Sequence, residues 1–550
     1  MRRTGWGITS LLWLVVVAPA WAGASQPSSF DQVISRINQR ETQFSQNMRN
    51  YTPMVETYLQ DMKPDAELGE VPSGDTYFLG RLDLSRGAST ASFVPDHSGW
   101  LHRMFGPLTG MKYNAAGFAV VSPDESELDT AHYDFAFVRR EFLGDVRCLV
   151  FDVVPRKNTG QGRFLGRLWV EDQDYNIVRF NGTFVPRPRF GYYFHFDSWR
   201  LNMGPNLWLP AYSYSEEQDM KYSMPHKRLW FKAQTRFWAY NVHSRGRQDE
   251  LTEVLVDPAP TVKDKSDNNQ DLSPVQSQRM WARQSEENVL DKLERVGLLA
   301  HDGEVDKVLE TVVNNIAITN KVDIQPEIQC RVLLTAPLES FSVGHTIVMS
   351  RGLLDVLPDE ATLAAVLAHE MAHILLAHGE SAMYGFSDKM LFNEQQTFTH
   401  LTLSHTPAQE QEADAKALEL LKNSPYKDQL ANAGLFMRAL QQRSPALPNL
   451  IRAHLGNGLT MGSNPRMSDL IASAPSLEMN KVDQIAALPM GARIKVDPWN
   501  DRAQMSKAKP VALLSAREKM FFEVTPVYPY LTRVSDKQAT EKVAATNPAR

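Results

Sequence analysis

The chain has 550 residues, of which 43% are apolar and 22% are charged, which is an ordinary globular composition. Its length exceeds what one compact core accommodates, so two or three domains are expected. The net charge of −6 gives no reason to expect nucleic acid as a partner.

Residues 1–24 have the three parts of a secretory signal peptide. A basic start is followed by an apolar run over residues 11–18 and then by Ala20, Ala22 and Ala24. The run is too short to cross a membrane comfortably, and an uncleaved anchor is the alternative. No cysteine follows it to carry a lipid anchor, and no other segment approaches 18 apolar residues. We therefore expect a mature chain without a transmembrane span, in the periplasm or another extracytoplasmic compartment.

Residues 29–62 carry apolar side chains at helical spacing, first around Ile34 and later at Met54, Tyr58 and Met62. This pattern predicts helical structure at the start of the first domain.

From residue 77 to residue 240, short segments alternate apolar and polar residues and are rich in aromatic side chains. They include YDFAFVRREFL, VRCLVFDVV, RFLGRLWVE and LWFKAQTRFWAY, separated by turns such as residues 143–145. Such segments predict one large antiparallel sheet, curled or closed on itself. The run LGRLWVEDQDYNIVRFNGTF and the strands after it resemble the half-barrel of periplasmic lipoprotein carriers of the LolA type. The resemblance implies a concave face for an apolar chain or peptide, and a structural or docking sheet is the alternative.

Residues 257–274, DPAPTVKDKSDNNQDLSP, are polar and contain three prolines, which predicts a linker. The β-rich domain would therefore span residues 25–256. Two helical stretches follow the linker, and then a strand is predicted over residues 346–350. This strand would pair with an extended peptide substrate by edge addition, or else lie inside a sheet.

The two cysteines, Cys148 and Cys330, lie on segments predicted as strands in different domains. An oxidising compartment would allow a bridge between them. Two separately buried thiols are the alternative, because the sequence gives no evidence of proximity.

Residues 358–379, PDEATLAAVLAHEMAHILLAHG, predict one helix with Pro and Asp at its start and Gly at its end. His369 and His373 are four residues apart, so both imidazoles project from one face and can bind one metal ion. Glu370 lies about a quarter-turn away, where its carboxylate would act as general base on a water that the metal activates. This is the H-E-x-x-H arrangement of zinc peptidases. The helix is apolar nearly all round and therefore buried, and a metal would satisfy the polar side chains inside it.

A catalytic zinc ion needs a third protein ligand. Residues 406–421, TPAQEQEADAKALELL, predict a helix with Thr406 as N-cap and proline at its first position. Glu410 and Asp414 share one face of it, while Glu412 faces roughly the opposite side. We expect Glu410 to be the third ligand of one zinc ion per chain, and Asp414 to orient a ligating histidine. A solvated acidic face is the alternative.

The combination of GLLDVLPDEATLAAVLAHEMAHILLAHG with EQEAD resembles the metallopeptidase family of the CAAX prenyl protease, HtpX and the Oma-type proteases, over about residues 275–475. That family pairs H-E-x-x-H with E-x-x-x-D, in which the first Glu ligates zinc. The resemblance implies a mainly helical zincin-type domain with a small sheet and endopeptidase activity. It also implies His369, His373 and Glu410 as ligands and Glu370 as base.

Without transmembrane helices the chain is more similar to the soluble periplasmic members, such as the protease that assists outer-membrane β-barrel assembly. This resemblance implies unfolded envelope proteins as substrates and leaves room for peripheral association with the outer membrane.

The sequence departs from the family at two places. Residues 339–341 read Glu-Ser-Phe where many members have Asn-Ala-Phe, and Asn464 stands where they have a histidine before proline. The role of that histidine, in gating the metal or steadying an oxyanion, is vacant or falls to Asn464, His345 or His454. His378 matches the family but lies too far round the predicted helix to join the ligands, which favours a core histidine.

The sequence therefore predicts an α+β protein: an antiparallel half-barrel-like domain, a metallopeptidase domain over residues 275–475 and an extended arm over residues 476–550. The predicted function is a secreted zinc-dependent metalloendopeptidase whose first domain recruits or presents protein substrate. The alternative is a non-catalytic envelope chaperone, or a lipoprotein- or peptide-binding protein, with a structural metal site.

Overall fold

The computed structural model describes most of the chain. The described ranges are 30–83, 89–93, 118–124, 127–186, 193–221, 228–240, 274–378, 401, 403–461, 464–491, 493–506 and 513–534. The predicted signal peptide and all but the last residue of the predicted linker lie outside these ranges.

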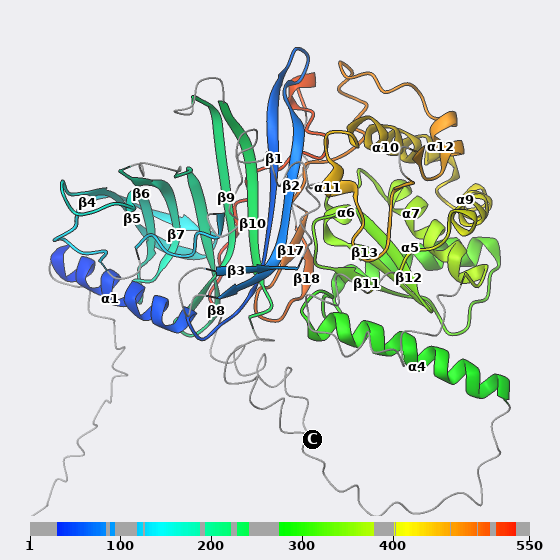
Figure 1. Ribbon diagram of the computed structural model, residues 1–550, viewed down its shortest axis with the longest axis horizontal. Helices are drawn as coiled ribbons and strands as arrows, with labels where there is room; N and C mark the ends of the chain where they lie inside the picture. The colour runs from blue at the N-terminus through cyan, green and yellow to red at the C-terminus, as the bar shows by residue number, and fades with distance from the viewer. Residues whose placement is uncertain are drawn as a thin grey trace, which may run out of the picture.

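Ten strands form one antiparallel sheet in the order β3-β2-β1-β10-β9-β8-β7-β6-β5-β4 (Figure 1). Among the described strands β3 and β4 are its two edges, so the sheet is open rather than closed. The predicted antiparallel domain is confirmed. The strands are β1 (Met54–Asp65), β2 (Gly69–Asp83), β3 (Ser89–Ser92), β4 (Tyr133–Leu143), β5 (Val146–Pro155), β6 (Arg163–Glu171), β7 (Ile177–Val185), β8 (Phe196–Gly204), β9 (Leu207–Lys221) and β10 (Arg228–Trp238).

Residues 54–62 form part of a strand, so the prediction of helical structure there is wrong. Met54, Tyr58 and Met62 are buried in β1. A spacing of four residues places side chains on one face of a helix and also on one face of a strand, because four is a multiple of the strand period. β1 pairs with both β2 and β10, and this pairing outweighs the local pattern.

The helix α1 (Phe30–Met48) covers part of one face of the sheet. Ile34 and Ile37 pack among aromatic side chains of β5 to β8. Glu41 accepts hydrogen bonds from both terminal nitrogens of Arg200 at 2.7 and 2.8 Å, and both side chains are buried. The chain's own helix therefore occupies this region, and an apolar ligand of the sheet stays a prediction.

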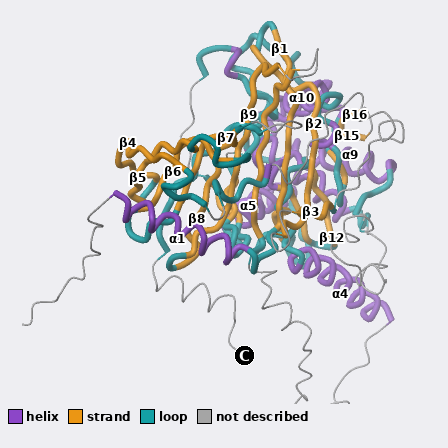
Figure 2. The backbone as a smooth tube through the Cα atoms, turned by 60° about the vertical axis from the view of Figure 1, so that its left-hand side comes forward, coloured by secondary structure: helices purple, strands orange, loops and turns teal. Residues whose placement is uncertain are grey.

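The remaining elements form a helical domain with a small sheet, as predicted, and Figures 1 and 2 both show α9 and α10 on the side of the molecule away from β4. No helix of the described ranges is long and apolar enough to span a membrane. The elements are α4 (Pro274–Arg295), α5 (Glu304–Asn320), β11 (Gln329–Leu333), β12 (Glu339–Val343), β13 (Thr346–Ser350), α6 (Arg351–Val356), α7 (Glu360–Leu375), α9 (Pro407–Lys422), η5 (Lys427–Gln429), α10 (Leu430–Arg443), α11 (Pro448–Ile451), β14 (Asn457–Gly458), β15 (Thr460–Met461), β16 (Asn464–Pro465), α12 (Ser468–Ser473), β17 (Ile494–Val496), β18 (Ala503–Met505) and η6 (Ala516–Glu518).

The small sheet has the order β11-β13-β12-β14. β13 pairs with β11 on one side and with β12 on the other, so it is an internal strand. The expectation that residues 346–350 receive a peptide by edge addition is therefore wrong. The predicted alternative, a strand inside a sheet, is the one observed.

The large sheet and the helical domain meet at a polar boundary. Glu56 of β1 forms an ion pair with Arg351 of α6, and the two side chains are 2% and 1% exposed. The same carboxylate accepts the backbone N–H of Ala336 at 2.6 Å and the hydroxyl of Tyr77 at 2.9 Å. Because removing one partner would leave a buried charge uncompensated, each part of the chain depends on the other here.

Residues after 475 contact both parts of the chain in extended segments. Gln60 of β1 donates to the carbonyl oxygen of Phe522 at 2.7 Å and accepts from the N–H of Val524 at 2.9 Å. On the other side, the N–H of Leu488 donates to the carbonyl oxygen of Val356 at 3.0 Å. The segment thus links the sheet to the helical domain.

Cys148 on β5 and Cys330 on β11 are both buried free thiols. The alternative of two separate thiols is therefore the one observed. Burial raises the pKa of Cys148 to about 12, so this thiol stays protonated at neutral pH.

Asp501, which follows β17, should make the free energy of unfolding depend on pH. It accepts the N–H of Ala239 at 2.7 Å, and burial raises its pKa from 3.8 to about 7. The folded state therefore binds the proton more tightly than the unfolded chain. The protonated Asp501 side chain therefore contributes to the free energy of unfolding. This contribution is fully present below about pH 4 and decreases by roughly 1.4 kcal/mol per pH unit until the pH has risen through about 7.

Asp501→Asn retains an acceptor without the charge, so we expect its stabilisation relative to the unchanged chain to grow between pH 5 and pH 8. Denaturant unfolding at both pH values measures it, with Asp483→Asn, an exposed aspartate, as control. An equal effect of Asp501→Asn at both pH values would contradict the prediction.

Candidate metal centre

The helix α7 carries three polar side chains into the interior. It begins after Asp359, whose side chain caps it by accepting the N–H of Thr362 at 2.8 Å. His369, Glu370 and His373 are at most 1% exposed. Three polar groups in such a site need partners, because an unpaired buried polar group costs several kcal/mol.

α7 ends at Leu375, earlier than the predicted end at residue 379, which lies outside the described residues. Ala377 has a φ of 51°, in the left-handed region. The N–H of Ala377 donates to the carbonyl oxygen of Ile374 at 3.1 Å, and that of His378 donates to His373 at 3.0 Å. This is the Schellman pattern, which usually places glycine where Ala377 stands. Because Ala377 stands where glycine is usual, nothing in the sequence indicates that the helix ends here.

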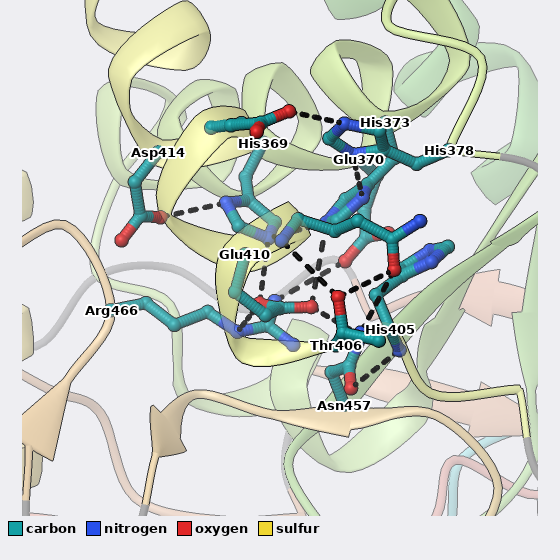
Figure 3. Close-up of polar contacts among 12 residues, drawn as sticks. His369, Glu370, His373, His378, His405, Thr406, Glu410, Asp414, Asn457 and Arg466 are labelled. Carbon is teal, nitrogen blue, oxygen red and sulfur yellow. Dashed lines mark hydrogen bonds and ion pairs between the residues drawn. The ribbon is translucent and has the colours of Figure 1, made fainter.

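The helix α9 supplies the third candidate ligand. Thr406 is its N-cap and forms a capping box with Gln409, as the predicted start requires. α9 packs against α7, and Glu410 is 3% exposed. Figure 3 shows Glu410 pointing toward the two histidines of α7.

The three predicted ligands converge. Nε2 of His369 lies 3.1 Å from Nε2 of His373 and 3.3 Å from Oε2 of Glu410, and Nε2 of His373 lies 3.5 Å from Oε1 of Glu410. One ligand atom of each residue lies within 4.8 Å of the others. Two nitrogens at about 2.0–2.1 Å from one tetrahedral zinc ion would be about 3.3 Å apart, so these spacings suit a metal.

Asp414 lies one turn beyond Glu410 on α9 and contacts the first histidine. Its Oδ1 lies 2.8 Å from Nδ1 of His369, and its Oδ2 accepts the N–H of Met467 at 2.8 Å. A proton on Nδ1 of His369 leaves Nε2 with a free lone pair directed at the other ligands. Asp414 is therefore close enough to orient His369, and that role stays a prediction.

Glu370 has one oxygen engaged and one free. Oε1 accepts the hydroxyl of Ser340 at 2.6 Å and lies 3.4 Å from Nη1 of Arg466. Oε2 is buried and has no hydrogen-bond partner among the described residues. A carboxylate fixed through one oxygen can use the other to accept a proton, which suits a general base.

Four residues of the site were not predicted: Ser340, Arg466, Asn457 and His405, whose ring stacks on that of His373 at 3.9 Å. Arg466 is 2% exposed, and its Nε lies 3.1 Å from Oε2 of Glu410. Asn457 donates to Oε1 of Glu410 at 2.6 Å. Ser340 lies within one of the two departures from the family pattern, and Arg466 lies two residues after the other. These departures were the feature of the sequence that could have pointed to both residues. Nothing in the sequence pointed to Asn457, because its position depends on its pairing with Ser340 between β12 and β14.

The candidates for the missing histidine gain no support. His345 lies near the turn between β12 and β13, with Nδ1 3.0 Å from the carbonyl oxygen of Pro326. The ring of His454 stacks on Tyr77 of the large sheet at 5.3 Å. The side chain of Asn464 lies outside the described residues.

The two histidines differ in their protonation. Burial lowers the pKa of His373 far below its ordinary value, and the adjacent His369 lowers it further. Burial and Arg466 also oppose protonation of His369, but hydrogen bonds to Asp414 and Glu410 outweigh them and raise the pKa of His369. A neutral His373 is the form that binds a metal.

The residues present fit a divalent metal. Two imidazole nitrogens face each other in a buried position, and the carboxylate of Glu410 completes the set. Two histidines and one carboxylate, with a second carboxylate on the same helix as the histidines, are the side chains that catalytic metal centres of the metallopeptidase type use.

Residues 301–479 match the model of Peptidase family M48, and the match supports a zinc metallopeptidase family for this part of the chain. The match agrees with the family expected from the two motifs. No curated protein matches the chain.

Two solved structures are similar to part of the chain. One is a DUF1329 family protein from Desulfovibrio piger, with 11% identity and a TM-score of 0.19 over 37% of this chain and 90% of the other. The other is a putative outer membrane lipoprotein-sorting protein domain from Vibrio parahaemolyticus, with 9% identity and a TM-score of 0.16 over 37% of this chain and 91% of the other. At such scores neither similarity establishes the fold or function of the large sheet.

Metal removal should destabilise the protein. A ligand that binds only the folded state stabilises it by about 2.7 kcal/mol at 100 times its dissociation constant. We expect a chelator to lower the thermal unfolding temperature and added zinc to restore it, as measured by calorimetry. His369→Ala should unfold at the same temperature with and without chelator. If the chelator does not change the unfolding temperature of the unsubstituted chain, the metal centre is contradicted.

Proposed function

We propose that the chain is a zinc-dependent metalloendopeptidase that hydrolyses peptide bonds of proteins outside the cytoplasm. The observation that supports this most is the convergence of His369, His373 and Glu410, together with a free carboxylate oxygen on Glu370, the neighbour of His369 in α7. Ligands and base come from two helices that pack together, so their geometry does not depend on a loop.

The proposed mechanism assigns a role to each side chain. His369, His373 and Glu410 would hold one zinc ion, which supplies Lewis acidity toward a carbonyl oxygen and makes water nucleophilic near neutral pH. Oε2 of Glu370 takes a proton from a water molecule while the oxygen of that water forms a bond to the peptide carbon. Glu370 then gives the proton to the leaving amine, and the C–N bond breaks.

Protein quality control in an envelope compartment is the proposed setting. The support is the signal-peptide pattern of residues 1–24 and the aromatic-rich sheet that packs against the metallopeptidase domain. The sheet would recruit or present unfolded envelope proteins, with peripheral association with the outer membrane as part of the proposal.

The alternative is a binding or chaperone-like protein with a closed, structural metal site. Structural zinc sites use four protein ligands, whereas catalytic sites use three and keep one position open. Within the described ranges, the candidate ligand group has three members. This favours the catalytic function.

Glu370→Gln tests the mechanism, because the amide keeps the size of the side chain but cannot take up the proton. We expect casein hydrolysis by the purified chain to fall by at least about 10²-fold while one zinc ion per chain remains bound. Cleavage rates and metal content of the same preparations measure this.

Glu419→Gln removes an exposed carboxylate from α9 and serves as the matched control, with hydrolysis expected at the unchanged rate. Full activity of Glu370→Gln would exclude Glu370 as base. A chain that binds one zinc ion and cleaves nothing would support the structural metal site instead.

A further inference from the structure

His378 lies against the second histidine ligand. Its Nδ1 is 3.1 Å from Nδ1 of His373, and its side chain is 7% exposed. Had α7 continued, His378 would have pointed away from the ligands. The turn at Ala377 instead returns the chain toward the last turn of the helix, and Figure 3 shows the two rings together.

The other ring nitrogen of His378 meets a carboxylate. Its Nε2 lies 3.1 Å from Oε2 of Glu412 on α9. Glu412 faces away from Glu410, as predicted, and is 66% exposed. It reaches His378 because that residue lies beyond the helix end, outside the ligand cluster.

Only one arrangement of protons satisfies this row of groups while His373 binds a metal. Nε2 of His373 must offer its lone pair, so Nδ1 carries the hydrogen and donates to Nδ1 of His378. His378 then carries its hydrogen on Nε2, which donates to Glu412.

We propose that His378 and Glu412 are positioning residues that fix the tautomer and ring orientation of His373 for metal binding. This inference rests on the proposed zinc site. In this arrangement α9 positions both histidines of α7. Asp414 contacts His369 directly, and Glu412 contacts His378, which in turn contacts His373. Neither positioning residue is a member of the candidate ligand group.

The zinc dissociation constant of the full chain, measured by competition with a chelator, tests the inference. His378→Ala should weaken zinc binding about 10- to 100-fold, which is the usual cost of losing such a partner. Glu412→Gln should have a smaller effect, and His378→Ala with Glu412→Gln together should lose no more than His378→Ala alone, because both act through one contact.

His378→Asn separates the hydrogen bond from the bulk of the ring. Its Oδ1 can still accept from His373 but cannot reach Glu412, so its affinity should approach that of Glu412→Gln. The controls are His345→Ala, a partly exposed histidine outside the site, and Glu419→Gln, each with unchanged affinity expected. Thermal unfolding in excess chelator should place metal-free His378→Ala close to the metal-free unchanged chain.

Unchanged zinc affinity in His378→Ala would overturn the inference, and so would equal losses in the Ala and Asn variants. These results leave the proposed function intact. A chain that binds zinc without cleaving protein would overturn the proposed function and leave the inference standing.

Discussion

The structure depends on the burial of two imidazole nitrogens and a carboxylate in one apolar helix. α7 packs on nearly every side, so His369, Glu370 and His373 have no access to bulk water. Each therefore needs a partner from another segment, because burial without one would destabilise the fold. α9 provides Glu410 and Asp414, β12 provides Ser340, and the chain after β16 provides an arginine. The polar cluster thus determines how these segments are arranged around α7.

The large sheet supports the segments that precede two of these partners. Glu56 of β1 accepts the N–H of Ala336, just before β12, and β12 carries the serine that contacts Glu370. Asp75 of β2 accepts the N–H of Leu450 at 2.8 Å, and residues 451–456 lead from there to β14 and Asn457. Two carboxylates of the sheet therefore fix the starts of the two strands that border the centre. This gives the sheet a structural effect on the site, separate from any contact with substrate.

The sequence predicted the parts of the site that local spacing determines. The four-residue spacing of the α7 histidines and of Glu410 with Asp414 depends only on helix geometry, and the N-cap at Thr406 depends on neighbouring residues. The same spacing does not distinguish a helix from a strand at residues 54–62, where strand pairing decides the structure. The end of α7 was missed because alanine replaces glycine at its left-handed position. Ser340, Asn457 and the arginine after β16 are far from α7 in sequence, so only the tertiary structure brings them together.

The balance of charge ties these observations together. Glu370, Glu410 and Asp414 bring three negative charges to the centre, and Arg466 returns one positive charge through contacts with Glu370 and Glu410. With both histidines neutral, the form in which they bind a metal, the cluster is left with two negative charges in a mostly buried space. Buried charges are stable only when they are paired, and one divalent cation at the histidine pair supplies the two positive charges that are needed. The arginine also reduces the negative charge around Glu370, so the remaining charge of the cluster matches one divalent ion rather than two.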